Sequence, residues 1–200
     1  MRLSDYVFER VAEAGVDSVF LVTGRGALFL TDALAKNENL KHFCMHNEQA
    51  VSYAANAYAQ VKNDIGVCLV STGCGSTNAV TGVLTAWQDG LPVVFISGQN
   101  TLRETQAHTG LAIRTFGQQE ADIVSIVKSI TKYAVTVQDP KVIGAVIDEA
   151  FYLANSGKKG PVWIDIPLDI QSARVEPEEL KRKIFNSTTK SMALDDLDFL

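Results

Sequence analysis

The sequence contains few of the residues that mark several common protein classes. It has 3 cysteines, 5 prolines and 3 histidines among 200 residues. Zinc sites need Cys-x-x-Cys-type spacing, which is absent, and an odd number of cysteines argues against a disulfide framework. We therefore expect reduced, mostly buried thiols at Cys44, Cys68 and Cys74. No window approaches the ~20 consecutive apolar residues that a membrane-spanning helix needs.

Basic residues are fewer than acidic ones. The chain carries 18 basic and 23 acidic residues, a net charge of −5, and shows no basic stretch of the kind that nucleic-acid binders present. The N-terminal residues, MRLSDYVFERV, are charged and amphipathic rather than signal-like. We therefore expect a cytoplasmic globular protein that has neither a nucleic-acid partner nor a membrane anchor.

Short apolar, β-branched segments alternate with segments of helical periodicity. The strand candidates are 18–23, 40–45, 65–71, 92–97, 133–137 and 161–166. The helix candidates are 4–14, 27–36, 48–60, 76–88, 119–130 and 140–155. Several strand candidates, such as PVVFI and VWIDI, are nearly continuous apolar runs, as in parallel strands that are covered on both faces. The pattern predicts an α/β fold, a three-layer open sheet of about six mainly parallel strands with helices on both faces.

The alternation stops near residue 168, which suggests a domain boundary. We expect one domain over 1–172, followed over 173–200 by a linker and the start of a further domain that is absent. The alternative is that residues 173–200 are a frayed C-terminal tail.

Glycine-rich segments follow two of the strand candidates. Gly24-Arg25-Gly26 precedes a helix, and the acidic Glu48 lies about twenty residues further on, which imitates a dinucleotide-binding fingerprint. The third glycine is missing, however, because Phe29 stands in its place. Gly73-Cys74-Gly75 fails in the same way, and neither segment is a phosphate-binding P-loop. Tight turns between strand and helix explain these glycines equally well.

Two other polar segments are candidates for chemistry. Glu48 opens a helix rich in alanine, where a carboxylate complements the helix dipole, and the small side chains would let another subunit approach and exclude water from it. The segment 101–122 is long and polar for a connection inside a domain, and segments of that kind are often functional. It contains Arg103, His108 and Arg114, although a single loop histidine is more often solvent-facing than catalytic.

Five blocks, taken in order, resemble one family. They are GVDSVFLVTGRGALFLTDAL, HNEQAVSYAANAYAQ, GVCLVSTGCGSTNAVTGVLTAWQDGLPVVFISGQ, QQEADIVSIVKSITKYAV and GPVWIDIPLDIQ. Together, over about residues 1–172, they resemble the N-terminal, pyrimidine-binding (PYR) domain of thiamine diphosphate enzymes of the acetolactate synthase group. The resemblance implies a cofactor, thiamine diphosphate, bound here by its pyrimidine end, and a 2-oxo acid substrate that is decarboxylated and joined to an acceptor.

The resemblance also implies roles for individual residues. Glu48 matches the family's glutamate, which hydrogen-bonds N1′ of the aminopyrimidine, and Gln119 matches a glutamine at the mouth of the active site that orients the substrate. Gly73-Cys74-Gly75 lies where the family commonly has Gly-Pro-Gly, and Arg25 stands in a turn usually occupied by small residues. The implied catalytic residues are Glu48 and Gln119, and the implied cofactor-binding residues are Gly24, Gly26, Glu48, Thr72, Gly73, Cys74, Gly75 and Asn78.

The family binds Mg²⁺ and the diphosphate through a Gly-Asp-Gly…Asn motif in a separate C-terminal domain. The nearest string here is Gln88-Asp89-Gly90, so the resemblance implies no metal ligand in this chain and half of an active site. The other half would come from a diphosphate-binding domain of the same or another chain, within a homodimer or tetramer assembled through PYR domains. Whether FAD is bound depends on a middle domain that is missing here.

Three interpretations remain open at this stage. The chain is the N-terminal part of an acetolactate synthase-like enzyme that is inactive alone, the natural alpha subunit of a split 2-oxo acid decarboxylase, or a non-catalytic interaction module with the same fold. The tail after residue 190 favours the first interpretation over the second. The presence of both Glu48 and Gln119 argues against the third.

Overall fold

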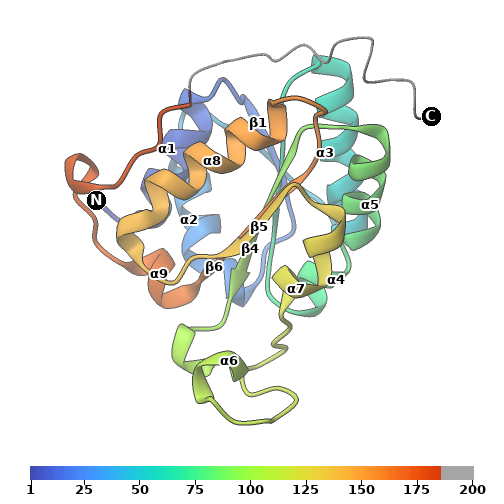
Figure 1. Ribbon diagram of the computed structural model, residues 1–200. Coiled ribbons are helices and arrows are strands. Elements are labelled where there is room, and N and C mark those ends of the chain that lie inside the picture. Colours follow the sequence, from blue (N-terminus) through green and yellow to red (C-terminus); the bar gives the residue numbers. More distant parts are fainter. Residues whose placement is uncertain (186–200) are drawn as a thin grey trace, which may run out of the picture.

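A six-stranded parallel sheet forms the centre of the molecule (Figure 1). The computed structural model describes residues 1–185, and in them the strand order is β2-β1-β3-β4-β6-β5 with every neighbouring pair parallel. The strands are β1 (Ser18–Leu21), β2 (Lys41–Cys44), β3 (Gly66–Val70), β4 (Val93–Gln99), β5 (Tyr133–Thr136) and β6 (Val162–Pro167). The six predicted strands and the α/β architecture are thus confirmed.

Helices cover both faces of the sheet. One face is packed by α1 (Leu3–Glu13), α2 (Leu28–Lys36), α8 (Ile143–Asn155) and α9 (Leu168–Ser172), the other by α3 (Glu48–Lys62), α5 (Val80–Asp89) and α7 (Ile123–Val127). Two short helices, α4 (Cys74–Thr77) and α6 (Gln106–Thr109), lie in connections. Because side chains alternate along a strand, Val67 and Leu69 belong to the first apolar cluster while Cys68 and Val70 belong to the second. The apolar runs of the sequence reflect this double burial.

Two helix predictions were wrong in their boundaries. The helix expected over 119–130 begins only at Ile123, because Gln119 has a positive φ of 54° and the side chain of Asp122 accepts a hydrogen bond from Ser125 N as the helix cap. The helix expected over 76–88 is divided into α4 and α5.

The expectation of mostly buried thiols was also wrong. Cys68 is buried in β3, but Cys44 and Cys74 are exposed. The reason for Cys44 is positional: β2 lies at the edge of the sheet, and all four of its residues are exposed. The polar residues Lys41 and His42 beside it, of the kind that edge strands carry, were the available signal in the sequence.

The first part of the expected linker lies against the domain. Val175 N donates a hydrogen bond to Met1 O (2.9 Å), Leu180 is buried, and Arg182 forms an ion pair with Asp148 on α8 (2.7 Å). The predictions for 186–200 lie outside the described residues.

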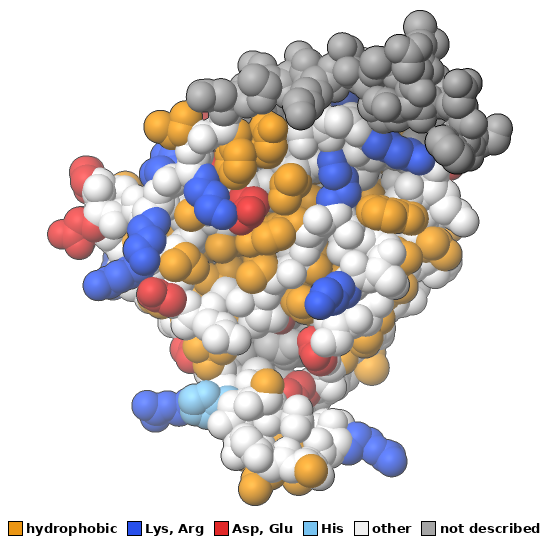
Figure 2. All heavy atoms as spheres, viewed as in Figure 1, with side chains coloured by type: hydrophobic (Ala, Val, Ile, Leu, Met, Phe, Trp, Pro, Cys, Tyr) orange, Lys and Arg blue, Asp and Glu red, His pale blue; other side chains and the backbone are white. Residues whose placement is uncertain are grey.

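The connection between β4 and α7 stands apart from the helical layers. This segment, 101–122, projects beyond the carboxyl ends of the strands and carries α6 near its tip (Figure 1). In Figure 2 it forms a protrusion with hydrophobic side chains at its far end, and Leu111 and Phe116 are exposed. None of the helices in residues 1–185 is both long and apolar enough to cross a bilayer.

Candidate cofactor-binding site

A cavity opens at the carboxyl ends of β1 and β3. From β1 the sheet continues to β2 on one side and to β3 on the other, so the chain order reverses between these strands. Ligands of open α/β sheets bind at such reversals. The cavity measures about 690 Å³ and is lined by Thr23, Gly24, Arg25, Gly26, Glu48, Ser71, Thr72, Cys74, Gly75, Thr77, Asn78, Gln118 and Gln119.

The turns that follow β1 and β3 contact each other directly. Gly26 N donates a hydrogen bond to Ser71 Oγ (3.1 Å), and a Cβ atom on Gly26 would lie only 2.8 Å from Thr72 Cβ. A Cβ atom on Gly24 would overlap the Ser71 side chain. The glycines of the first turn therefore serve close packing between two loops, and this packing forms one wall of the cavity.

Gly73 is buried in the turn after β3 and brings this turn into contact with the 101–122 segment. Its φ of 59° and ψ of −115° belong to a region that other residues rarely adopt, and a Cβ atom there would overlap the carbonyl oxygen of Gln119. Gln119 itself has a positive φ. The turn after β3 and the end of the 101–122 segment are thus in backbone contact, which brings the Gln119 side chain to the cavity.

Glu48 enters the cavity from the first turn of α3. Asn47 caps this helix by accepting a hydrogen bond from Ala50 N (3.2 Å), which fixes where the helix begins. Asn78 Nδ2 donates to Glu48 Oε2 (2.7 Å). The other oxygen, Oε1, is 3.4 Å from the position of a Cβ atom on Gly75, so a glycine there leaves room beside the carboxylate. The side chain of Asn78 therefore orients the carboxylate over the glycine turn.

A buried glutamine connects several parts of this site. Gln99, at the end of β4, is 4% exposed, and its Oε1 accepts hydrogen bonds from Thr72 Oγ1 (2.5 Å) and Asn100 N (3.0 Å). Its Nε2 donates to Ala121 O (3.0 Å) and to Asp165 Oδ2 (3.4 Å). One amide side chain thus holds the turn after β3 and the far end of the 101–122 segment.

Asp165 is an acidic residue inside the sheet. It is 2% exposed on β6, and its carboxylate accepts hydrogen bonds from Ser97 Oγ (2.6 Å), from Thr136 Oγ1 (3.3 Å) and from Gln99. Burial raises the pKa of this carboxyl group to about 7, because the protein interior disfavours its charged form. Its protonation state therefore changes near neutral pH. It does so next to Gln99, the residue that connects the turn after β3 to the 101–122 segment.

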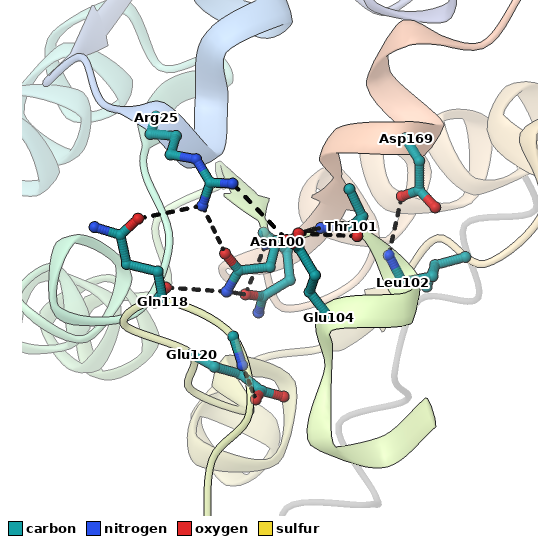
Figure 3. A network of polar contacts seen from close by, with 10 residues as sticks. Arg25, Asn100, Thr101, Leu102, Glu104, Gln118, Glu120 and Asp169 are labelled. Atoms are coloured by element: carbon teal, nitrogen blue, oxygen red, sulfur yellow. Dashed lines mark hydrogen bonds and ion pairs between the residues drawn. The ribbon is translucent and has the colours of Figure 1, made fainter. Parts of the chain in front are cut away.

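Arg25 joins the first turn to the 101–122 segment (Figure 3). Its Nη1 donates to Asn100 Oδ1 and to Gln118 Oε1, both at 3.3 Å, and its Nη2 is 4.0 Å from Glu104 Oε1. Asn100 Nδ2 in turn donates to Gln118 O (3.0 Å). These contacts hold the base of the 101–122 segment beside the cavity.

Of the residues that the sequence predicted for the site, eight line this one cavity: Glu48, Gln119, Gly24, Gly26, Thr72, Cys74, Gly75 and Asn78. Gly73 is buried below it, and His108 is exposed on α6 away from it. Sequence reasoning missed Gln99, Ser71 and Asp165. The available signal for Asp165 was an acid alone in an otherwise apolar strand, which indicates a specific set of buried partners.

The residues present fit a flat, polar ring that needs a proton-holding partner. They offer an oriented carboxylate and a turn without side chains against which a ring can lie. Among residues 1–185 no group of three or more His, Cys, Asp or Glu side chains is arranged to hold a metal ion.

Comparison with known proteins agrees with this geometry. Residues 1–126 match the family described as "Thiamine pyrophosphate enzyme, N-terminal TPP binding domain". The chain is 38% identical over 158 residues to the acetolactate synthase large subunit of Cyanidium caldarium, covering 78% of this chain and 26% of the relative. It is 42% identical over 159 residues to that of Parasynechococcus marenigrum (strain WH8102), covering 78% and 24%.

A plant relative gives the same result: acetolactate synthase 2, chloroplastic, of Zea mays is 37% identical over 174 residues, covering 87% of this chain and 26% of the relative. The chain thus spans about a quarter of the length of these curated relatives. The family match covers more than half of the chain and contains the glycine turns, Glu48 and Asn78. The chain belongs to the thiamine pyrophosphate enzymes and carries the N-terminal thiamine pyrophosphate-binding domain of acetolactate synthase-like proteins.

Proposed function

We propose that this chain supplies the pyrimidine-binding half of the active site of an acetolactate synthase-like enzyme, which decarboxylates a 2-oxo acid and joins the product to an acceptor. The observation that carries the proposal is the Glu48 carboxylate, oriented by Asn78 and facing a turn of glycines inside the cavity. The relatives, which are acetolactate synthases, support this activity.

In this proposal Glu48 and the glycine turn hold the aminopyrimidine ring. Asn78 occupies Oε2, so Oε1 is the oxygen that would exchange a proton with N1′ of the ring. The backbone at Cys74 and Gly75 would lie against the ring face, because no side chain at Gly75 intervenes. Bound thiamine diphosphate supplies a carbon nucleophile and an electron sink for the electron pair that decarboxylation leaves behind.

Gln119 adds to the proposed site from the end of the 101–122 segment. Its side chain lines the cavity, and its backbone is held by Gly73 and, two residues further on, by the bond from Gln99 to Ala121. An amide in that place can donate a hydrogen bond to a substrate carbonyl oxygen without adding charge. We assign Gln119 this orienting role.

The remaining parts of the enzyme are proposals that rest on the sequence resemblance. A diphosphate-binding domain of the same or another chain would hold Mg²⁺ and the diphosphate. A second copy of the PYR domain would pack on α3, where Tyr53 and Ala57 are exposed, and on the adjoining α5, whose Leu84 is also exposed. Such packing would remove water from Glu48, at the start of the same helix.

The test is Glu48→Gln in the enzyme assembled with its diphosphate-binding domain. We expect turnover to fall by about 10²- to 10⁴-fold, the range for loss of a positioned acid–base group. Glu38→Gln, at an exposed glutamate between α2 and β2, is the matched control and should leave turnover unchanged. Unchanged turnover in Glu48→Gln would rule out the assignment.

A calorimetric titration with thiamine diphosphate and Mg²⁺ tests the half-site arrangement separately. We expect no heat of binding with this chain alone and clear binding once a diphosphate-binding domain is present. Tight binding by the chain alone would contradict the arrangement.

A further inference from the structure

The cavity contains one cationic side chain. Among its lining residues only Glu48 and Arg25 are charged, and Arg25 belongs to the turn after β1, whereas Glu48 belongs to α3. An anionic substrate that entered this cavity would be repelled by the Glu48 carboxylate. Arg25 is the lining residue that can offset this repulsion.

The guanidinium of Arg25 is only loosely held. Its two hydrogen bonds, to the amide oxygens of Asn100 and Gln118, are both 3.3 Å long, which is beyond the usual 2.7–3.2 Å range for such bonds. The side chain is 55% exposed, and its contact with Glu104 is 4.0 Å, so water screens this ion pair and it holds the guanidinium only weakly. Figure 3 shows the guanidinium spanning these partners.

The nearest carboxylate is already bound elsewhere. Oε2 of Glu104 accepts hydrogen bonds from Thr101 Oγ1 (2.9 Å) and Thr101 N (3.2 Å), which close a helix cap. These bonds hold the pKa of Glu104 below its usual value, so it remains a charged part of that cap. The five N–H groups of Arg25 thus meet two neutral acceptors, and a carboxylate ligand forms stronger, paired hydrogen bonds with a guanidinium than amide oxygens do.

We propose that Arg25 binds the carboxylate of an anionic acceptor, a second 2-oxo acid, and so selects anionic over neutral acceptors. This inference rests on the proposed function. Of the two substrates, the donor and the acceptor, the acceptor is the better ligand for Arg25. The donor's carboxylate must leave as neutral CO₂, so a guanidinium bound to it would stabilise the ground state and slow the reaction, whereas the acceptor keeps its carboxylate in the product.

The test compares Arg25→Met and Arg25→Lys in the assembled enzyme, with a 2-oxo acid acceptor and with a neutral aldehyde acceptor. We expect Arg25→Met to raise KM for the anionic acceptor about 10- to 100-fold, as for loss of a hydrogen bond to a charged group. KM for the aldehyde and the rate of CO₂ release from the donor should stay unchanged. Arg25→Lys should recover part of the lost affinity for the anionic acceptor, because lysine keeps the positive charge but not the paired N–H donors of the guanidinium.

Arg103→Met is the matched control. Arg103 is exposed on the same segment, does not line the cavity, and has no ion pair among the described residues, so its variant should behave as the wild type. Thiamine diphosphate affinity, measured by calorimetry in the same variants, should not change. A wild-type enzyme that releases no CO₂ would refute the proposed function itself.

Two outcomes would overturn the inference while leaving the proposed function intact. Equal losses with anionic and neutral acceptors, together with a lower melting temperature, would make Arg25 a structural link to the 101–122 segment. Weaker thiamine diphosphate binding in Arg25→Met would make it a cofactor contact instead.

Discussion

The α-carbon of Gly73 lies so close to the carbonyl oxygen of Gln119 that no side chain fits between them. The two residues are far apart in sequence, one in the turn after β3 and the other near the end of the 101–122 segment. Their contact sets the distance between the glycine turn and the Gln119 side chain. The shape of the cavity, as well as that of the turn, therefore depends on the absence of a side chain at Gly73.

We predict that Gly73→Ala destabilises the protein by about 3 kcal/mol or more. The positive φ is strained for alanine, and in addition the new methyl group overlaps the backbone of Gln119. Gly157→Ala is the control: Gly157 has a similar φ of 57° but nothing within 4 Å of a Cβ atom, so only the cost of about 1 kcal/mol for φ applies. Urea unfolding of both variants measures the difference. Equal losses of stability would show that the contact with Gln119 is unimportant.

Gln99→Met should loosen the site without changing the volume of the side chain greatly. The substitution leaves Thr72 Oγ1 and Asn100 N without their acceptor, and a buried unsatisfied group costs about 1–3 kcal/mol. It also removes one of the two donors to Ala121 O, which keeps the hydrogen bond from Ile123 N. We expect faster amide hydrogen exchange at the turn after β3 and in the 101–122 segment. Gln60→Met, exposed on α3, should change neither stability nor exchange. Exchange that increases evenly over the whole chain would contradict a local role for Gln99.

Asp165 makes stability depend on pH in a defined direction. Its pKa is raised from 3.8 to about 7, so between these values the folded protein holds a proton that the unfolded chain has released. This group's contribution to the free energy of unfolding therefore falls as the pH rises from about 4 to about 7. Asp165→Asn removes that dependence.

Urea titrations at several pH values measure the free energy of unfolding of the wild type minus that of Asp165→Asn. The difference should decrease across this window by on the order of a few kcal/mol and become level above it. A difference that stays constant from pH 4 to 8 would show that Asp165 titrates as an ordinary carboxyl group.

Thiol labelling should separate the three cysteines. Burial raises the pKa of the Cys68 thiol and shields it, so iodoacetamide should modify Cys44 and Cys74 in the folded protein and Cys68 only after unfolding. Mass spectrometry of peptides identifies the sites. Because Cys74 lines the cavity and Cys44 does not, thiamine diphosphate bound in the assembled enzyme should slow labelling at Cys74 alone. Equal protection of Cys44 and Cys74 would contradict the position proposed for the cofactor.

The succession of strands and helices along the chain, and most of the residues that line the cavity, could be predicted from the amino-acid sequence. Buried parallel strands need continuous apolar runs such as VWIDI, and turns that pack closely need glycine, so both features are visible in local pattern. Glu48 and its helix start could be found in the same way, from a cap residue followed by an acid and a run of alanines. The family resemblance then added roles that local pattern does not contain.

Which of these features act together depends on contacts that form only in the folded protein. The exposure of Cys44 follows from the edge position of β2, and the bond from Gln99 to Thr72, the overlap at Gly73 and the loose contacts of Arg25 all join segments that are distant in sequence. Local periodicity reports which side of an element is apolar, but not which element lies opposite. Contacts of that kind are set by strand order and by the path of the 101–122 segment, which exist only once the chain has folded.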